Sequence, residues 1–244
     1  FELASYAKKV AESLGTTVTA VTVNAGDVSE LSKYGVDKVL KVNNDKLSGF
    51  TAKAYADVIK QAAQKENIKL ILLSSTTDSL YLSPLVAVAL EAGYTSNVVG
   101  LPLSTSPFQV KRTAFSNKAF MITEINTDVK VLGLAKNSYG MFENPSTLTE
   151  EDFNPTIGEN DFGVKVESVE KVTGKVSIAD ADIVVSAGRG LKGPENWGMI
   201  EELASVLGAA TACSKPVSDL GWRPHGEHVG QTGKPVAANL YIAI

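Results

Sequence analysis

Strand, glycine-rich turn, helix and second strand follow one another in residues 183–215, IVVSAGRGLKGPENWGMIEELASVLGAATACSK. A strand is expected at 183–186, because a β-branched apolar run of this length is typical of a buried parallel strand. A formal G-x-G-x-x-G follows at 188–193, and a helix is expected from Pro194 or Glu195 to Leu207. Such a turn can direct backbone N–H groups and the positive end of a helix at an anion, and Arg189 adds a fixed charge. The pattern predicts a site for a phosphate-bearing ligand.

Glycine spacing alone leaves other interpretations open. One is an NADP-dependent oxidoreductase in which residues 188–193 hold the pyrophosphate and Lys215 the 2′-phosphate. A nicotinamide site usually adds an acidic residue at the end of the second strand, and here that strand, 209–212, runs into Cys213. Another is a nucleotide-binding regulatory module with no redox role. The simplest is a tight turn that needs glycine only for packing.

Several further motifs follow in a fixed order through the same segment. They are VVSAGRGLK at 184–192, EN at 195–196, CSK at 213–215, DLGW at 219–222, VGQTGK at 229–234 and LYIA at 240–243. In this order and at these separations they closely resemble the FAD-binding domain of the electron-transfer flavoprotein alpha subunit. The earlier part of the chain resembles the first domain of that family more loosely.

The resemblance implies a set of contacts to FAD. Arg189 matches the arginine of the G-R-G turn, which contacts the cofactor, and Ser214 matches a serine that binds it. Lys215 stands where the pattern has an arginine over the flavin ring, so the charge is kept and the planar donor fork is lost. The V-G-Q-T loop, whose threonine lies against the flavin near N5, corresponds to Val229, Gly230, Gln231 and Thr232.

By the same resemblance the chain is expected to be an electron carrier rather than an enzyme. A flavin carries the chemistry while side chains set its potential, so no catalytic residue is expected. The family implies a heterodimer with a beta subunit, electrons from flavin dehydrogenases such as the acyl-CoA dehydrogenases of fatty-acid β-oxidation, and delivery to electron-transfer flavoprotein quinone oxidoreductase. A role in flavin-based bifurcation stays open. The expected compartment is the bacterial cytoplasm, or the mitochondrial matrix in a eukaryote.

Composition argues against other classes of partner. The formal net charge of −4, with no run of Lys and Arg, argues against a nucleic-acid ligand. No stretch is long and apolar enough to predict membrane insertion. The single cysteine, Cys213, excludes an internal disulfide, and with only two histidines in the chain no metal site is expected.

Two α/β domains are expected on either side of a linker. The first, 1–136, alternates strands and helices, which predicts a parallel Rossmann-like sheet. Residues 137–163 contain Asn-Pro pairs and little apolar periodicity, and are the expected linker. An edge strand at 164–172 then opens the FAD-binding domain, 164–244, also Rossmann-like (DHS-like). The expected elements of the first domain are helices at 1–14, 29–34, 51–66 and 81–91 and strands at 18–23, 37–42, 70–73, 110–114, 119–124 and 129–134.

The two ends of the sequence suggest a partial chain. The sequence opens inside a helix, so the first strand of the first domain is expected upstream of Phe1. It closes on an apolar strand at 239–244, so part of the flavin site is expected beyond Ile244, and the chain alone is expected to hold FAD weakly.

A second polar turn, SSTTDS at 74–79, follows the strand at 70–73. Open α/β sheets commonly hold ligands at this end of a strand. Serine and threonine also cap helices, and capping is the favoured interpretation here.

Overall fold

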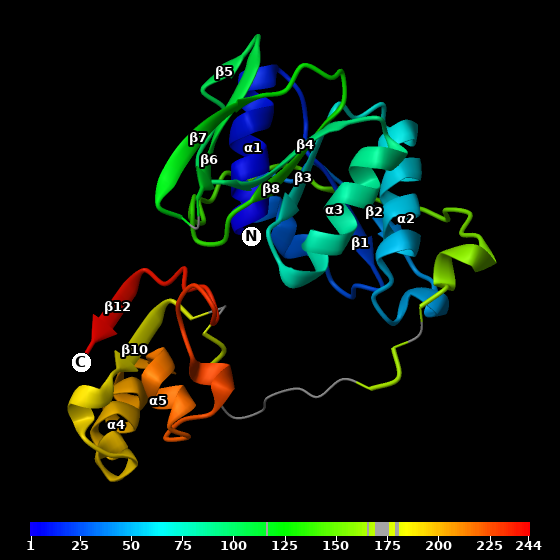
Figure 1. Ribbon diagram of the computed structural model, residues 1–244. Helices are drawn as coiled ribbons and strands as arrows, with labels where there is room; N and C mark the ends of the chain where they lie inside the picture. The colour runs from blue at the N-terminus through cyan, green and yellow to red at the C-terminus, as the bar shows by residue number, and fades with distance from the viewer. Residues whose placement is uncertain (116, 165, 169–175, 179–180) are drawn as a thin grey trace. The chain divides into compact units, whose positions relative to one another are not determined.

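The computed structural model describes residues 1–244 except 116, 165, 169–175 and 179–180 (Figure 1). The chain divides into two compact units, Phe1–Ser168 and Val169–Ile244. Both have the α/β character that the sequence predicts. The edge strand expected at 164–172 falls largely on residues outside the described set, and residues 164 and 166–168 adopt no regular structure. Within the described ranges, no helix combines the length and the apolar character that crossing a bilayer needs.

The smaller sheet of the first unit has three parallel strands in the order β1-β2-β9. Helix α1 (Glu2–Leu14) precedes β1 (Thr19–Val23), and the 3₁₀ helix η1 (Ser29–Tyr34) leads to β2 (Lys38–Val42). Helix α1 ends where Gly15 adopts a φ of 65°, so that its N–H bonds back to the last turn of the helix. These elements agree with the pattern of apolar residues in the first 42 positions.

Strand β9 (Thr149–Asp152) lies inside the range 137–163, where the sequence predicted a linker. It pairs with β2 in parallel from Lys38↔Thr149 to Lys41↔Asp152. Upstream, the carboxylate of Glu2 accepts the backbone N–H groups of Asn137, Tyr139 and Gly140 at 2.8–3.0 Å. Residues 137–152 therefore belong to the first unit, through contacts with residues more than 100 positions away that leave no local periodicity.

The larger sheet of the first unit mixes parallel and antiparallel strands in the order β3-β8-β4-β6-β5, with β7 on the free side of β6. Strand β8, expected at 129–134, lies between β3 and β4 and runs parallel to both. The polar strand β4 was not predicted, because GYTSNV shows neither alternation nor a β-branched run. The strands are β3 (Leu70–Ser74), β4 (Gly93–Val98), β5 (Ser104–Thr105), β6 (Phe108–Ala114), β7 (Ala119–Glu124) and β8 (Lys130–Leu134).

Helices α2 (Ala52–Lys65) and α3 (Thr77–Ala89) pack side by side on this unit (Figure 1). Helix α3 begins four residues before the expected start at 81. Thr76 caps it, since its hydroxyl accepts the N–H of Ser79 at 3.2 Å. The hydroxyl-rich turn at 74–79 is therefore a helix cap, as favoured from the sequence.

The second unit holds a parallel sheet in the order β11-β10-β12. Its strands are β10 (Ile183–Ala187), β11 (Ala210–Cys213) and β12 (Leu240–Ala243). Helix α4 (Gly198–Leu207) connects β10 to β11, and the short helix α5 (Lys215–Asp219) follows β11 (Figure 1). The fully buried Ile200 of α4 packs with Val185 and Cys213 of the strands, so the helix and the sheet share one core.

Candidate functional site

The three strands of the second unit end together, and backbone hydrogen bonds continue past their ends. The Gly188 N–H donates to the carbonyl of Ile244 at 3.0 Å, and the Ser214 N–H donates to Ala187 at 3.2 Å. The Val229 N–H donates to Cys213 at 3.1 Å. The chain segments after β10 and β11 and the segment at 229 therefore lie next to one another at the carboxyl edge of the sheet, where open α/β sheets bind ligands.

Two cations and a hydroxyl occupy this edge. Arg189 begins the 3₁₀ turn η4 (Arg189–Leu191) directly after β10, and Lys215 begins α5 directly after β11. Both side chains are exposed, and neither forms an ion pair with any carboxylate that the structure describes. A Cβ built on Gly188 would lie 3.9 Å from Ser214 Oγ, so this hydroxyl borders the first glycine of the turn. No hydrogen bond of Ser214 Oγ occurs among the described residues, which leaves it available to a ligand.

The glycine-rich turn does not lead straight into an α-helix. The range expected to begin the helix at Pro194 forms the 3₁₀ turn η5 (Pro194–Trp197), and α4 starts at Gly198. A Cβ on Gly193 would clash with the carboxylate of Glu195, so this carboxylate lies over the last glycine of the motif. Its negative charge opposes any anionic group at Gly193, so the anion-binding group of this turn is Arg189 at its start.

Residues 228–234 form a closed turn. The Gly233 N–H donates to the carbonyl of Gly230 at 3.0 Å, and the Lys234 N–H donates to His228 at 2.8 Å. Gly230 adopts a φ of 125°, which only glycine tolerates well, and a Cβ on Gly233 would lie 2.5 Å from the His228 carbonyl oxygen. Both glycines are therefore required by the turn itself. Gln231 and Thr232 are exposed at its tip, and Val229 is half-buried at its base.

A largely buried ion pair, which was not predicted from the sequence, stabilises the segment that precedes this turn. Arg223 donates Nε and Nη2 to the two carboxylate oxygens of Glu227 at 2.7 and 2.8 Å, and Nη1 to Glu201 of α4 at 2.8 Å. Its guanidinium also lies over the ring of Trp197, 5.3 Å from the centroid. The only local signal is an Arg and a Glu four residues apart in a stretch without helical periodicity. Arg223 thus fastens the segment before the turn to the helix between β10 and β11.

The thiol of Cys213 and the ring of His228 lie in the interior behind this edge. Both residues are buried, and they face each other across an isolated parallel bridge. Burial and the neighbouring charge of Glu227 raise the pKa of Cys213, against a smaller lowering by Arg223, so the thiol stays protonated at neutral pH. His228 Nδ1 has no hydrogen-bond partner among the residues that the structure describes. No group of three or more His, Cys, Asp and Glu suited to a metal ion occurs among the described residues.

The residues at this edge fit the FAD that the sequence implies. An FAD pyrophosphate is an anion, and Arg189 and Lys215 are cations on adjacent strand ends that pair with no carboxylate of the described residues. The free Ser214 hydroxyl and the exposed turn at 230–232 supply uncharged hydrogen-bonding groups at the same edge. The architecture brings the predicted residues to one end of one sheet.

Two family models match the chain. The electron transfer flavoprotein domain matches residues 1–154, and the electron transfer flavoprotein FAD-binding domain matches residues 177–244. The second match covers the whole of the edge just described.

Curated relatives align with nearly the entire chain. An electron transfer flavoprotein subunit alpha of Thermoanaerobacterium thermosaccharolyticum is 32% identical over 99% of this chain and 76% of its own length. The protein of the same name from Bacillus subtilis is 31% identical over 88% of this chain and 66% of its own length. The lactate dehydrogenase (NAD(+),ferredoxin) subunit LctC of Acetobacterium woodii is 28% identical over 100% of this chain and 60% of its own length.

Proposed function

This chain belongs to the electron transfer flavoprotein alpha subunit family, with FAD as its cofactor, and from that membership we propose that it holds FAD at the carboxyl edge of the β11-β10-β12 sheet. As a member of this family it transfers electrons and turns over no substrate of its own. Bound FAD supplies one-electron and two-electron transfer. The observation that carries the proposal is the presence of two cations, Arg189 and Lys215, beside the hydroxyl of Ser214, all three without a side-chain partner in the described part of the chain.

We assign separate roles to the residues at the edge. Arg189 binds an anionic part of the cofactor through its donor fork, and Ser214 adds a hydrogen bond. Lys215 supplies a positive charge that stabilises the flavin when it gains negative charge on reduction, and so raises its potential. The closed turn of Val229, Gly230, Gln231 and Thr232 presents backbone and side-chain groups to the ring, and the Arg223 pair fixes the segment before it.

The proposed partners follow the family. We propose a beta subunit as the permanent partner, flavin dehydrogenases such as acyl-CoA dehydrogenases as electron donors, and electron-transfer flavoprotein quinone oxidoreductase as acceptor, within fatty-acid β-oxidation. The organisms of the curated relatives are bacteria, which favours the cytoplasm as the compartment. Similarity to a subunit of a lactate dehydrogenase (NAD(+),ferredoxin) supports lactate oxidation as a second candidate process.

The test of the cofactor site compares two neighbouring cations. The full chain, co-expressed with the beta subunit, is titrated with FAD, and the dissociation constant is followed by flavin fluorescence. Arg189→Met should weaken binding about tenfold or more, since one charge-assisted hydrogen bond is lost. Lys192→Met, at an exposed position in the same turn that carries no proposed contact, is the matched control and should change binding less than about threefold. Equal losses in both variants would show that Arg189 acts only through general charge.

The test of the process uses reduction by defined donors. Flavin absorbance is followed anaerobically after addition of an acyl-CoA dehydrogenase with its acyl-CoA, and separately after addition of NADH. Rapid bleaching by the first donor only is the expected result. Bleaching by NADH alone would contradict the β-oxidation role and favour the lactate-type process.

A further inference from the structure

A polar hollow lies at the carboxyl ends of β1 and β2 in the first unit. The two strands are in register up to the pair Val23↔Val42, so they end side by side. The loops that follow them enclose a volume of about 720 Å³, which is within the range of small-molecule sites. Open α/β sheets commonly bind ligands at this end of their strands. The lining residues are Asn24, Ala25, Gly26, Asn43, Asn44 and Asp45.

The walls of this hollow are held together by hydrogen bonds between the two loops. The Asn24 N–H donates to the carbonyl of Val42 at 2.8 Å. The Asn24 side chain donates Nδ2–H to the Asn44 carbonyl at 2.9 Å and accepts the Asn44 N–H on Oδ1 at 2.8 Å. Asn24 adopts a φ of 49°, a conformation that asparagine tolerates better than most residues. The two loops are therefore fixed relative to each other before any ligand binds.

Other groups of the hollow are available to a ligand. Among the described residues, the side chains of Asn43 and Asp45 form no hydrogen bond or ion pair, and the backbone N–H groups of Ala25 and Gly26 have no acceptor. Gly26 has no positive φ, and a Cβ built on it would meet nothing within 4 Å. Neither the backbone conformation nor packing requires glycine at this position, whereas the missing side chain keeps the hollow open.

The order of these groups matches the part of a nucleotide-binding unit that holds a ribose. In such units a glycine-containing turn follows the first strand, and an acidic residue about twenty positions later, after the second strand, accepts hydrogen bonds from the ribose hydroxyls. Here Gly26 follows β1, and Asp45 follows β2 at about that separation. The second unit has Cys213 and then Ser214 at the corresponding strand end, so only the first unit supplies this acid.

The charges around the hollow favour an uncharged ligand. Asp27 directly follows the first loop, and the N–H of Ser29, with the Ser29 hydroxyl, holds the pKa of its carboxyl below the usual value. The lysines that flank the second loop, Lys41 and Lys46, each pair with a glutamate. Within the described ranges no cation lines the hollow, and the carboxylates of Asp27 and Asp45 would repel a phosphate.

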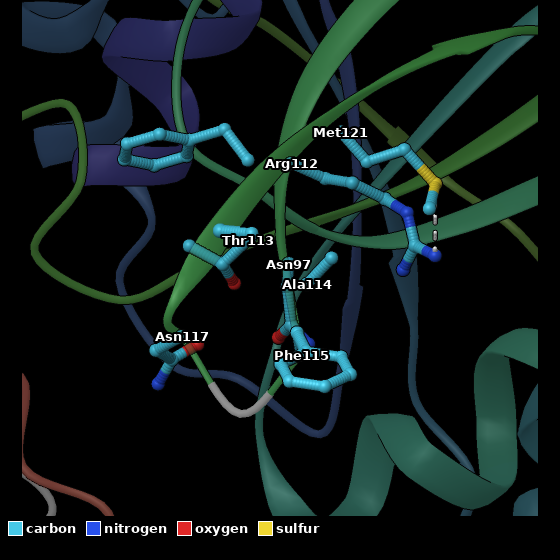
Figure 2. Close-up of a pocket in the computed structure, with 9 residues that line it drawn as sticks. Asn97, Arg112, Thr113, Ala114, Phe115, Asn117 and Met121 are labelled. Atoms are coloured by element: carbon cyan, nitrogen blue, oxygen red, sulfur yellow. Dashed lines mark hydrogen bonds between the residues drawn. The ribbon is translucent and has the colours of Figure 1, made fainter.

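A different hollow of the first unit has another chemistry. It measures about 590 Å³ and lies beside the β6–β7 hairpin, where Arg112 Nη2 lies 3.7 Å from Met121 Sδ. The ring of Phe115 and the side chain of Asn97 also line it (Figure 2). A cation and apolar side chains dominate there, whereas amides, a carboxylate and backbone groups line the hollow after β1 and β2. Only the latter hollow combines the acceptors and donors that a ribose and a base need.

We propose that the first unit binds an adenine ribonucleoside in the hollow after β1 and β2. Asp45 accepts hydrogen bonds from the 2′- and 3′-hydroxyls of the ribose. The Asn43 amide pairs with the adenine edge, because an asparagine can accept from the N6 amino group and donate to N7. The N–H groups of Ala25 and Gly26 donate to the remaining acceptors of the ligand. None of these residues belongs to the proposed FAD site.

The experiment titrates the full chain with adenosine in a calorimeter. One adenosine should bind per chain with a dissociation constant below about 1 mM. 2′,3′-Dideoxyadenosine, which lacks both hydroxyls, should bind about tenfold more weakly or worse, because the acceptor pair of Asp45 is then left without donors. AMP should bind about threefold more weakly than adenosine or worse, because its phosphate meets Asp27 and Asp45.

Variants place the bound adenosine on the structure. Gly26→Leu should weaken binding about tenfold or more, because the new side chain fills the hollow. Gly49→Leu, at a glycine outside the hollow whose Cβ would also meet nothing within 4 Å, is the matched control and should bind like the wild type. Asp45→Ala should weaken adenosine about tenfold and leave the affinity for 2′,3′-dideoxyadenosine unchanged. Thermal melting should match the wild type in all variants, because the substituted positions are exposed.

Three outcomes would overturn the proposal. The first is the absence of adenosine binding up to about 10 mM. The second is binding that survives Gly26→Leu, and above all binding that is lost instead in Arg189→Met, which would place adenosine at the proposed FAD site. The third is tighter binding of AMP than of adenosine. The FAD titration of the same chain is independent of this result, so a failure of one proposal leaves the other intact.

Discussion

Breaking the buried pair between Arg223 and Glu227 should destabilise the second unit by about 3 kcal/mol. Removing one partner of a buried ion pair costs about 3–5 kcal/mol, because the remaining charge is left without compensation. The two side chains are only 12% and 10% exposed, which places them in this class. Glu201, the second partner of Arg223, is 51% exposed and remains after Glu227→Leu, so the lower end of the range applies.

The assay is guanidinium chloride unfolding followed by tryptophan fluorescence. Both tryptophans of the chain, Trp197 and Trp222, pack in the core of the second unit, so the signal reports on that unit. Arg223→Leu and Glu227→Leu should each lower the free energy of unfolding by about 3 kcal/mol. The double variant should come within about 1 kcal/mol of the wild type, since a well-packed apolar pair leaves no buried charge.

Two results would refute this reasoning. Single variants that differ from the wild type by less than about 0.5 kcal/mol would place the pair among weak surface pairs. A double variant as unstable as the sum of the singles would show that the two residues act independently. Glu30→Gln, which breaks the exposed pair with Lys33, serves as the control. It should lower the free energy of unfolding, followed by circular dichroism, by less than about 0.5 kcal/mol.

The remaining predictions concern single groups. Gly233→Ala should destabilise the second unit by roughly 2 kcal/mol in the same assay, because its Cβ meets the His228 carbonyl, whereas Gly190→Ala, with nothing within 4 Å, should be neutral. Cys213 should not react with a thiol reagent at pH 8 until the protein is unfolded, since it is buried and its pKa is raised; reaction at the rate of a free thiol in the native protein would contradict this. Lys38 and Lys65 lower the pKa of Glu151 from 4.5 to about 2, so the stabilisation is present above about pH 4.5 and is lost as the pH falls through about 2; Glu151→Gln should therefore flatten that part of the melting-temperature profile, and an unchanged profile would disprove it. Lys215→Gln should lower the two-electron flavin potential, measured by anaerobic dye titration, by about 30 mV if the reduced flavin loses about 1.4 kcal/mol of stabilisation. An unchanged or raised potential would exclude the proposed charge effect.

The second unit was the easier part to predict, because its signals are local. The apolar run of β10, the glycines after it and the proline before α4 are all adjacent in sequence, and each restricts the backbone on its own. The predicted start of α4, at Pro194 or Glu195, was wrong, because the 3₁₀ turn at Pro194 has the same residue preferences as the first turn of an α-helix. The positions of Arg189, Ser214 and Lys215 at one edge follow from parallel pairing of β10 with β11.

The features that were missed depend on distant partners. Strand β9 has an acidic sequence that forms a strand because it pairs with β2, which carries two lysines. The polar strand β4 forms because it pairs with β8. The third member of the Arg223 cluster, Glu201, is 22 positions away on another element. In each case the stabilising contact appears only after the chain has been folded, so no window of the sequence contains it.

The pairing of β2 with β9 has a consequence for synthesis of the chain. Lys38 is synthesised long before its partner Thr149. At a synthesis rate of about 5–20 residues per second, the interval is several seconds or more. Throughout that time β2 presents a bare strand edge of the sequence KVLKV, in which only the two lysines oppose association with another nascent chain. In the folded chain, Lys38 pairs with Glu151 and Lys41 pairs with Glu150. The charges that oppose association during synthesis therefore stabilise the pairing of β2 with β9 after folding.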